Sequence, residues 1–570
     1  MRSQQKSSMQ QLAEKFSATA LINSLLREWR DFEIKNNEIV FSREHKTLSV
    51  VLGNYSSVGC HALEAAFYRT TGTHKECISF EVFIQELFGI IDKRNKTDGM
   101  HMLYSRVLES CRNLMDILRY RQPDFDALIR KPRLSFIDAE QSLLLGHNIH
   151  PCPKSKAEFK KRDHQLYTPE FREAFSLKWG LLSKSYFFQN HSKYFDDKDW
   201  YADLFEQDLG CNADRTYLPF PFHPWQFNTL GKNKQVTELI NNRELIPVEK
   251  TGKLKWRATS SLRTIYCEDS DYMLKFSLSL RITNSIRHLQ TVEVVRGLQV
   301  HEVMQSTNGR QFLAAHANFM ILNEPSFLAI KHASKPIVLE TIVLIRENPF
   351  SVFAGKESIV LSTLTQPNPY LGEGFLSARN VDAEQWFSMY LENVLDPFVM
   401  AQANYGILFG AHQQNIIVQL VDSYPIGVIF RDCQGTGYTR LGYEKMKTEV
   451  PSLNIDNGNI LDGHMAHALL GYYLIINSTF SLINALATQC DCAEQKMLRM
   501  LYQYLCDKKN SALLDSSFVD YLLHSSTLKQ KGNFFCCLRG VNENTEKNPL
   551  DIYNAIENPL YKISKNVCHA

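Results

Sequence analysis

Basic and hydroxyl side chains are concentrated in residues 260–287 of this 570-residue chain. The basic residues are Arg263, Lys275, Arg281 and Arg287, and the hydroxyl residues include Ser261, Thr264, Ser277, Ser279 and Thr283. No carboxylate lies between Lys275 and Arg287. Because guanidinium, ammonium and hydroxyl groups bind phosphate and carboxylate oxygens, the cluster predicts a site for a nucleotide phosphate and a carboxylate. A solvated sheet face would show the same run of charge, so that alternative stays open.

Alternating apolar and polar residues predict that Tyr272 to Arg281 form one half-buried strand. Lys275 and Arg281 would then share a face of that strand. Residues 262–266 would pair with it through a short acidic turn, which places Arg263 beside Lys275. Two strands would therefore line one cleft.

The hydroxyl and amide residues at 283–285 are good helix caps, and they predict a helix that runs to about Gln305. Arg287 would lie in the first turn of this helix, where backbone N–H groups also favour anions. The helix start would add to the anion site formed by the two strands.

A second polar group flanks a predicted β-hairpin. His412 and Asn415 precede an apolar strand at 416–421, and Asp432 follows a second strand at 426–430. Kinases use this layout of an Asn and an Asp to hold magnesium against ATP phosphates, although their sequence motifs are absent here. Mg²⁺ binds hard oxygens and keeps several waters, so these two residues would suffice if phosphates supply the other ligands. An Asn next to a hairpin also arises by chance, which leaves a purely structural alternative open.

Taken together, these residues resemble the aerobactin-synthetase (IucA/IucC) family of siderophore synthetases, which work independently of a peptide-synthetase assembly line. The matching segments keep the family's order between positions 146 and 435. They are Gly146 to Lys156, Tyr167 to Phe171, His223 to Gln226, Ser261 to Thr264, Lys275, Ile282 to Asn284 with Arg287, His412 to Asn415, and Arg431 to Gly435.

The resemblance implies an α+β fold with a cupped-hand architecture. A helical thumb would span residues 1–140, fingers with an antiparallel sheet 141–347, and a palm with a kinase-like layout of the metal-binding hairpin 348–570. ATP would lie between the fingers and the palm. The length agrees with two or three domains, because a single core does not grow to 570 residues.

Helical periodicity supports parts of this architecture. Apolar residues recur at helical spacing from Ile22 to Trp29 and from Leu103 to Leu118 in the predicted thumb. Two further helices are predicted in the palm, at 465–486 and 494–505.

The resemblance also implies residue roles by motif position. ATP would be bound by His150, Lys154, Ser261, Arg263, Thr264, Lys275 and Asp432. The carboxylate substrate would be bound by Thr283, Arg287 and His412, the catalytic residues would be Lys275, Arg287 and His412, and Mg²⁺ would be held by Asn415 and Asp432. His223 is interpreted as a structural corner with Gln226 as its one direct ligand contact, and Lys156 is a further candidate for ATP.

The implied reaction is activation of a citrate carboxylate by ATP. A citrate oxygen would attack the α-phosphorus and release pyrophosphate, and an amine or hydroxyl would then attack the citryl adenylate to form an amide or ester and AMP. Both steps build negative charge, which fixed cations in a dry cleft stabilise. Two alternatives remain, a ligase that uses a pre-formed citryl-amine intermediate or α-ketoglutarate, and a non-enzymatic citrate or ferric-siderophore binding protein.

Several properties stay open at this point. The acceptor is a polyamine, an amino acid or an amino alcohol, and neither its identity nor the stereochemistry at citrate follows from the motifs. A homodimer is what the resemblance implies for the oligomeric state. Gly410 stands where many members carry a Glu, so the metal site has one ligand fewer if that Glu binds magnesium, and water or Glu373 would replace it.

Composition excludes some classes of function. The net charge of +2 and the pI of about 7.9 are below the range expected of a nucleic-acid-binding protein. Charges throughout the first thirty residues and the lack of an apolar run of about twenty residues argue against export or a membrane span, so a cytoplasmic bacterial location is expected.

Cysteine usage agrees with a reducing compartment. The thirteen Cys are odd in number and scattered, as expected of reduced thiols. The palm is also similar to a ferric-siderophore reductase domain in which a Cys pair and a later Cys-x-x-Cys hold an iron–sulfur cluster. Only Cys568 follows Cys537 here, so no cluster is expected.

Overall fold

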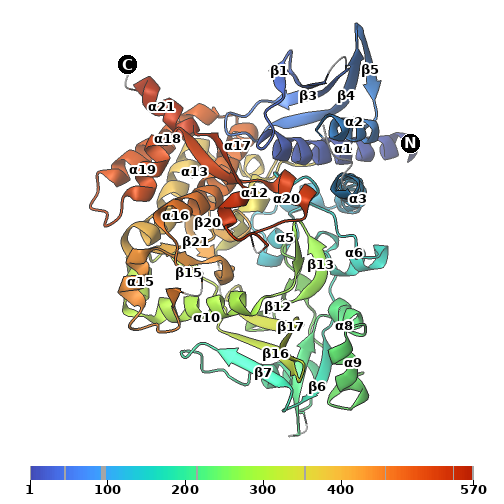
Figure 1. Ribbon diagram of the computed structural model, residues 1–570, viewed down its shortest axis with the longest axis vertical. Helices are drawn as coiled ribbons and strands as arrows, with labels where there is room; N and C mark the ends of the chain where they lie inside the picture. Colours follow the sequence, from blue (N-terminus) through green and yellow to red (C-terminus); the bar gives the residue numbers. More distant parts are fainter. Residues whose placement is uncertain are drawn as a thin grey trace.

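The computed structural model describes residues 2–43, 46–91, 98–213, 216–351, 355–370, 372–455, 458–543 and 545–567. Figure 1 shows an N-terminal sheet at the top, a second sheet system at the bottom, and a large helical C-terminal part beside both. Helices and strands are mixed throughout, as expected for an α+β protein.

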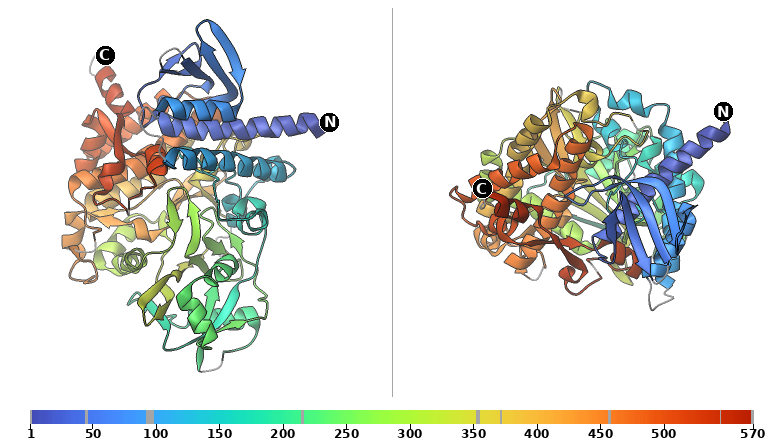
Figure 2. Two further views of the ribbon diagram at one scale, coloured as in Figure 1. Left: turned by 45° about the vertical axis from the view of Figure 1, so that its right-hand side comes forward. Right: turned by 90° about the horizontal axis from the view of Figure 1, so that it is seen from above.

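The N-terminal part contains a five-stranded antiparallel sheet in addition to helices. Its strands, in spatial order, are β1 (Glu33–Lys35), β2 (Glu38–Arg43), β3 (Lys46–Asn54), β4 (Ala62–Thr71) and β5 (His74–Ile78). Its main helices are α1 (Arg2–Leu26), α2 (Phe80–Ile91) and α3 (Asp98–Arg121). Figure 2 shows the sheet stacked on α1.

The N-terminal part was predicted to be mainly helical, and its five-stranded sheet was not predicted. Leu48, Val50 and Leu52 alternate along β3 and are buried against α1 and α2, which is the period of a half-buried strand. Helix α1 ends at Leu26, so Trp29 lies outside it. The predicted helix at Leu103 to Leu118 is confirmed within α3.

The middle part carries a six-stranded antiparallel sheet, which confirms the sheet predicted for the fingers. In spatial order its strands are β10 (Arg257–Ala258), β11 (Thr264–Tyr266), β12 (Tyr272–Phe276), β17 (Lys335–Glu347), β16 (Ser326–His332) and β7 (Phe187–His191). A three-stranded sheet, β8 (Tyr217–Phe222), β6 (Lys178–Ser183) and β9 (Leu245–Val248), packs nearby with α7 (Trp200–Leu209), α8 (Pro224–Leu230) and α9 (Lys234–Asn241). Three fully buried tryptophans, Trp179, Trp200 and Trp256, fill the core of this part.

The predicted strand from Tyr272 to Arg281 is broken at Ser277. The chain leaves the six-stranded sheet there and continues as β13 (Leu278–Ile282), which pairs with β14 (Ser285–Arg287) in a separate hairpin. The hydroxyl of Ser277 accepts a hydrogen bond from the Leu289 N–H at 2.9 Å and so ties the two ends of this hairpin together. Lys275 and Arg281 therefore lie in different sheets.

The predicted helix start at 283–285 is also wrong. Thr283 adopts a φ of 55°, in the left-handed region, and turns the chain into β14 instead of a helix. Helix α10 (Thr291–Gln305) begins six residues after Ser285 and ends where the sequence predicted. Arg287 therefore lies in a strand, and it does not belong to the first turn of a helix as predicted.

The C-terminal part is built on a four-stranded sheet in the order β15 (Phe319–Ile321), β21 (Tyr424–Phe430), β20 (Ile416–Val421) and β18 (Glu357–Val360). The predicted hairpin is confirmed as β20 and β21. Its two-residue turn has positive φ at Asp422 and Ser423, as in a type I′ turn, so the second strand starts two residues earlier than predicted.

Long helices complete the C-terminal part, and both predicted helices are confirmed. The first is a continuous helical run of α16 (Gly463–Leu470), a π-helical segment η7 (Gly471–Thr479) and α17 (Phe480–Gln489), and the second is α18 (Glu494–Lys509). The run from Gly463 to Gln489 is long and apolar enough to cross a membrane, contrary to the expectation that no such segment exists. Because 83% of its most apolar window is buried inside the protein, it has the character of a core helix.

Candidate active site

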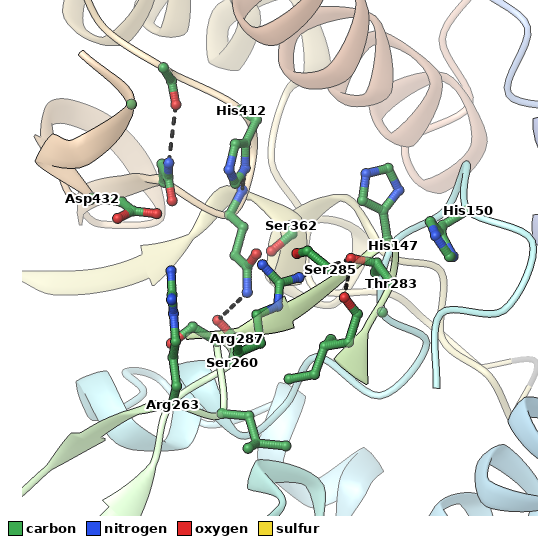
Figure 3. Close-up of a pocket in the computed structure, with 18 of the residues that line it drawn as sticks. His147, His150, Ser260, Arg263, Thr283, Ser285, Arg287, Ser362, His412 and Asp432 are labelled. Carbon is green, nitrogen blue, oxygen red and sulfur yellow. Dashed lines mark hydrogen bonds between the residues drawn. The ribbon is translucent and has the colours of Figure 1, made fainter. Parts of the chain in front are cut away.

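A cavity of about 480 Å³ lies between the middle and C-terminal parts of the chain. Eleven of the site residues predicted from the sequence line this cavity: His150, Lys154, Ser261, Arg263, Thr264, Lys275, Thr283, Arg287, His412, Asn415 and Asp432. Figure 3 shows Arg263 and Asp432 on one side of it, His147 and His150 on the other, and His412 and Arg287 between them. The fold therefore brings together motifs that are up to 282 positions apart in the sequence, although the individual roles stay predictions.

The side of the cavity around Asp432, here called the Asp432 end, is held by a buried charge network. Lys275 forms an ion pair with Asp432 and lies 3.2 Å from Glu324, which also binds Arg346 at 2.6 Å. Burial raises the pKa of the Asp432 carboxyl, but Lys275, Arg346 and Arg263 outweigh it and hold that pKa well below its usual range. Asp432 is therefore a carboxylate at any physiological pH.

Asp432 is also conformationally unusual. Its φ of 74° lies in the left-handed region, which few residues other than Gly adopt and which is enriched at functional sites. The sharp turn directs the chain from β21 into the short segment at 433–435, whose last residue lines the cavity. The Asp432 carboxylate thus enters the cavity two residues after strand β21 ends.

Asn415 and Asp432 together supply oxygens that suit magnesium. The Asn415 side-chain N–H donates to the Gly410 carbonyl oxygen at 3.1 Å, which leaves its amide oxygen for another contact. The ion pair with Lys275 engages one Asp432 oxygen and leaves the second. Hard oxygens of this kind fit Mg²⁺, which takes few protein ligands when phosphates are present.

Gly410 is tightly packed, so a side chain there would require its neighbour to shift by a few tenths of an ångström. A Cβ atom at this position would lie 3.1 Å from the Gly435 carbonyl oxygen, so the absence of a side chain lets the two segments cross. The expectation that Glu373 replaces the missing family carboxylate is wrong. Glu373 pairs with Arg130 at 3.0 Å on the surface, and its side chain is 54% exposed.

Arg287 carries a charge without a carboxylate partner. Its guanidinium donates to the Thr283 hydroxyl at 2.9 Å, but it forms no ion pair with the described residues, and its Nε–H has no hydrogen-bond acceptor among them. Burial, together with the charge of Arg263, lowers the pKa of Arg287 to about 10, so it still carries its proton at neutral pH. A buried cation of this kind is stabilised by an anion in the cavity.

Three cavity histidines share one hydrogen-bond arrangement. In His147, His150 and His412 the Nδ1 atom accepts a hydrogen bond from the backbone N–H two residues later, at 3.2–3.3 Å. Burial lowers the pKa of His412 to about 4, so the ring is neutral at neutral pH and carries its single proton on Nε2. The Nε2–H of the neutral His412 ring is therefore a hydrogen-bond donor toward the cavity.

Two predicted ATP ligands are already engaged by protein groups. His150 Nε2 lies 3.0 Å from the Asn284 amide oxygen. Lys154 lies 2.6 Å from Glu170 and donates to the Leu143 carbonyl oxygen at 3.1 Å, and both charged side chains are almost fully buried. Lys154 thus has a structural partner that the sequence did not reveal.

Gln226 is not a ligand contact, contrary to the prediction. Its amide binds the Ser279 hydroxyl and N–H and the Glu340 carbonyl oxygen, and it does not line the cavity. The structural interpretation of His223 is confirmed, because its Nδ1 accepts from the Trp225 N–H and caps helix α8.

Sequence reasoning missed Glu140, which joins all three parts of the chain. It ends helix α5 (Phe136–Glu140), and its carboxylate accepts from the Ser260 N–H and hydroxyl, both at 2.8 Å, and from Arg431 at 2.8 Å. Glu140 and Arg431 are at most 3% exposed. The only available signal was Arg431 beside Asp432, since a buried arginine requires a carboxylate somewhere in the fold.

A second polar wall of the cavity, here called the Glu543 end, was also missed. Glu543 accepts from Tyr473 at 2.8 Å and Tyr553 at 3.0 Å, and its second oxygen lies 2.7 Å from the Lys531 ammonium. Tyr473 comes from the π-helical segment η7, a type of helix that is frequent at functional sites. Lys531 ends strand β23 (Thr527–Lys531), and no motif marks these residues in the sequence.

Two family models match the chain. The "IucA / IucC family" model matches residues 135–366, and the "Ferric iron reductase FhuF-like transporter" model matches residues 384–546. The second match confirms the predicted similarity of the C-terminal part to a ferric-siderophore reductase domain.

Related proteins match over nearly the whole length. The chain is 32% identical to the N(2)-citryl-N(6)-acetyl-N(6)-hydroxylysine synthase of Vibrio mimicus, covering 96% of both proteins, and 31% identical to the spermidine-citrate ligase of Bacillus anthracis, covering 81% of this chain and 79% of the relative. The structure of ATP-bound aerobactin synthetase IucA from Klebsiella pneumoniae matches with a TM-score of 0.89 at 27% identity, covering 96% of this chain and 99% of that one. The chain therefore belongs to the IucA/IucC family of siderophore synthetases.

Proposed function

We propose that the protein adenylates a carboxylate of citrate with ATP and condenses the product with an amine or alcohol, releasing pyrophosphate and AMP. The observation that carries this proposal is Arg287, a buried cation without a carboxylate partner among the described residues, in the same cavity as Lys275, Arg263 and Asp432. A polyanion is the ligand that such a cavity stabilises. The relatives that match over most of the chain bear the names of citrate ligases and synthases, which supports citrate as the carboxylate.

The Asp432 end is assigned to the nucleotide. Ser261, Arg263, Thr264 and Lys275 would bind the triphosphate, and His150 and Lys154 would close the cavity over it from the loop at 146–156. Asn415 and Asp432 would hold Mg²⁺, which neutralises phosphate charge when bound. The name of the matching ATP-bound relative supports the use of ATP.

Citrate is assigned to the middle of the cavity. Arg287 and Thr283 are already hydrogen-bonded to each other and would face its carboxylates together. The neutral His412 ring would donate a hydrogen bond from its Nε2–H to a carboxylate or to the oxygen that becomes negative when the adenylate is attacked. Lys275 would stabilise the charge that develops at the α-phosphate.

The finer architecture is part of the same proposal. We assign residues 1–140 to the thumb, 141–347 to the fingers and 348–570 to the palm of a cupped hand, with ATP between fingers and palm in a kinase-like layout. We further propose a homodimer in the bacterial cytoplasm, without a nucleic-acid or membrane partner.

The test is an exchange assay with free citrate. The purified protein, given Mg²⁺, ATP, citrate and labelled pyrophosphate, is expected to return label to ATP, and addition of an amine is expected to give a citryl amide detectable by mass spectrometry. Asp432→Asn should lower the exchange by about 10²- to 10³-fold, the size expected when one charge-stabilising group is lost. Exchange that requires a pre-formed citryl-amine or α-ketoglutarate would favour the alternative ligases, and ligand binding without ATP turnover would favour a carrier.

A further inference from the structure

The N-terminal part contributes nothing to the cavity wall, since the lining residues in the described chain begin at Leu143. Helix α3 of this part nevertheless contacts two segments that do line the cavity. Figure 2 shows α3 below α1, on the side that faces the middle part. Its residues Arg106, Glu109, Ser110 and Asn113 are three or four positions apart, so they form one row along the helix, here called the α3 row. Arg106 and Ser110 are buried.

Two members of the α3 row hold Lys154 by its backbone. Lys154 belongs to the loop at 146–156, which the proposed function assigns to the nucleotide. Its N–H donates to the Ser110 hydroxyl at 2.9 Å, and its carbonyl oxygen accepts from the Asn113 side-chain amide at 2.9 Å. The loop therefore cannot shift along the helix at this point without losing two hydrogen bonds.

Glu109 holds the end of the same loop. One of its oxygens accepts from the Lys156 N–H at 2.8 Å, and the other accepts from the Ser155 hydroxyl at 2.5 Å. Lys154 and Lys156 both line the cavity, whereas Glu109 does not. Helix α3 thus fixes the backbone from which two cavity cations project.

Arg106 reaches the side of the cavity that is assigned to citrate. Its guanidinium donates to the Thr283 carbonyl oxygen at 2.6 Å, and it also contacts the Cys537 sulfur at 3.1 Å and the Ser155 hydroxyl at 3.4 Å. Thr283 is the residue with left-handed φ whose hydroxyl accepts from Arg287 (Figure 3). A residue other than Gly keeps such a conformation only where its surroundings hold it. Arg106 therefore stabilises the turn that orients Arg287.

We propose that Arg106 is a positioning residue for citrate and that Glu109, one helical turn further along α3, is a positioning residue for the nucleotide. Neither side chain lines the cavity, so each acts through the backbone that it binds. Helix α3 then sets the distance between the turn at Thr283 and the loop at 146–156, which brings the citrate carboxylate to the α-phosphorus. This inference rests on the proposed function, since it concerns the two substrates of that reaction.

The experiment measures KM for citrate and KM for ATP separately by citrate-dependent pyrophosphate exchange. Arg106→Met and Glu109→Met keep much of the length of each side chain and remove its polar atoms. Arg106→Met should raise the KM for citrate about tenfold, because a hydrogen bond from a charged donor is lost, and leave the KM for ATP nearly unchanged. Glu109→Met should raise the KM for ATP and spare citrate.

Two further variants sharpen the comparison. Arg112→Met makes the same substitution as Arg106→Met on the exposed face of α3, and it should change neither KM. Arg106→Lys keeps one cationic donor for the Thr283 carbonyl oxygen, so its KM for citrate should lie between those of the wild type and Arg106→Met.

The outcomes separate this inference from the proposed function. Absence of citrate-dependent exchange in the wild type would overturn the proposed function. Normal wild-type exchange with an unchanged KM for citrate in Arg106→Met would overturn only the positioning role of α3. Equal rises of both KM values in both variants would also overturn it, because a general loosening of the fold affects both substrates alike. Thermal unfolding shows which variants are folded, and Arg106→Lys decides by the same criteria if Arg106→Met is not.

Discussion

The two ends of the cavity use the same kinds of side chain but balance their charge differently. At the Asp432 end, the three cations Lys275, Arg346 and Arg263 act on two carboxylates, Glu324 and Asp432, and Lys275, Arg346 and Glu324 are at most 3% exposed. At the Glu543 end, one lysine faces one carboxylate, and both remain partly open to the cavity. A surplus of rigidly held cations suits a polyanion, whereas the pair at the Glu543 end is balanced and partly solvated.

This difference separates charges that the fold holds rigidly, at the Asp432 end, from charges that can change more easily, at the Glu543 end. A buried network is costly to disturb and holds its charges in one geometry, which is what stabilisation of a developing anion needs. A partly exposed pair is easier to replace during evolution.

The largest expected effect is a loss of folding stability when Glu140, the buried partner of Arg431, is removed. Glu140→Ala would leave Arg431 buried without its carboxylate, which typically costs about 3–5 kcal/mol of stability. The midpoint of thermal unfolding measured by calorimetry should fall clearly. The comparison is Glu543→Gln, which should shift the midpoint much less because its ion pair is partly exposed. Equal shifts in the two variants would contradict the difference between the ends.

A smaller effect separates the nucleotide from the carboxylate. Arg287→Ala should raise the KM for citrate about 10- to 100-fold, because a hydrogen bond to a charged group contributes about 1.5–3 kcal/mol. Its affinity for ATP should change little. Arg263→Ala should do the reverse, and isothermal titration with each ligand measures both. A similar loss of both ligands in each variant would refute the assignment of separate positions.

The smallest expected effect is a missing pH inflection. The pKa of His412 is lowered from 6.5 to about 4, so the ring stays neutral between pH 5 and 8 and kcat/KM should show no step near 6.5 that depends on it. Because the unfolded ring binds a proton below about pH 6.5, this histidine lowers the stability of the folded state as the pH falls from 6.5 to 4. A step near 6.5 that disappears in His412→Asn would show instead that the ring titrates in the working range.

The sequence predicted the members of the site better than the elements that carry them. Eleven predicted residues line one cavity and Gln226 does not. Short motifs identify chemically active residue types even when the surrounding elements are mispredicted. The left-handed Thr283 turn and the break at Ser277 were missed, since helix caps and strand alternation describe only local preference. Tertiary pairing overrides such preference, and the hydroxyl of Ser277 illustrates this by bonding to Leu289 twelve positions away.

The missed residues are those whose partners lie far away in the sequence. Glu140 is 291 positions from Arg431, and Glu324 is 49 positions from Lys275. A single carboxylate on an ordinary helix has no pattern that marks it before the fold is known. The N-terminal sheet is different, because the alternation of Leu48, Val50 and Leu52 was present in the sequence and was overlooked.

Glu140 has a mechanical consequence for substrate exchange. Because the Glu140 carboxylate binds Ser260 of the middle part and Arg431 of the C-terminal part, both of which line the cavity, the two parts cannot separate there without exposing buried charge. Any widening that admits nucleotide or releases product should therefore occur by rotation about this point, with the largest displacement at the rim. We therefore expect the middle and C-terminal parts to rotate relative to each other about Glu140 while the contact at Glu140 stays closed.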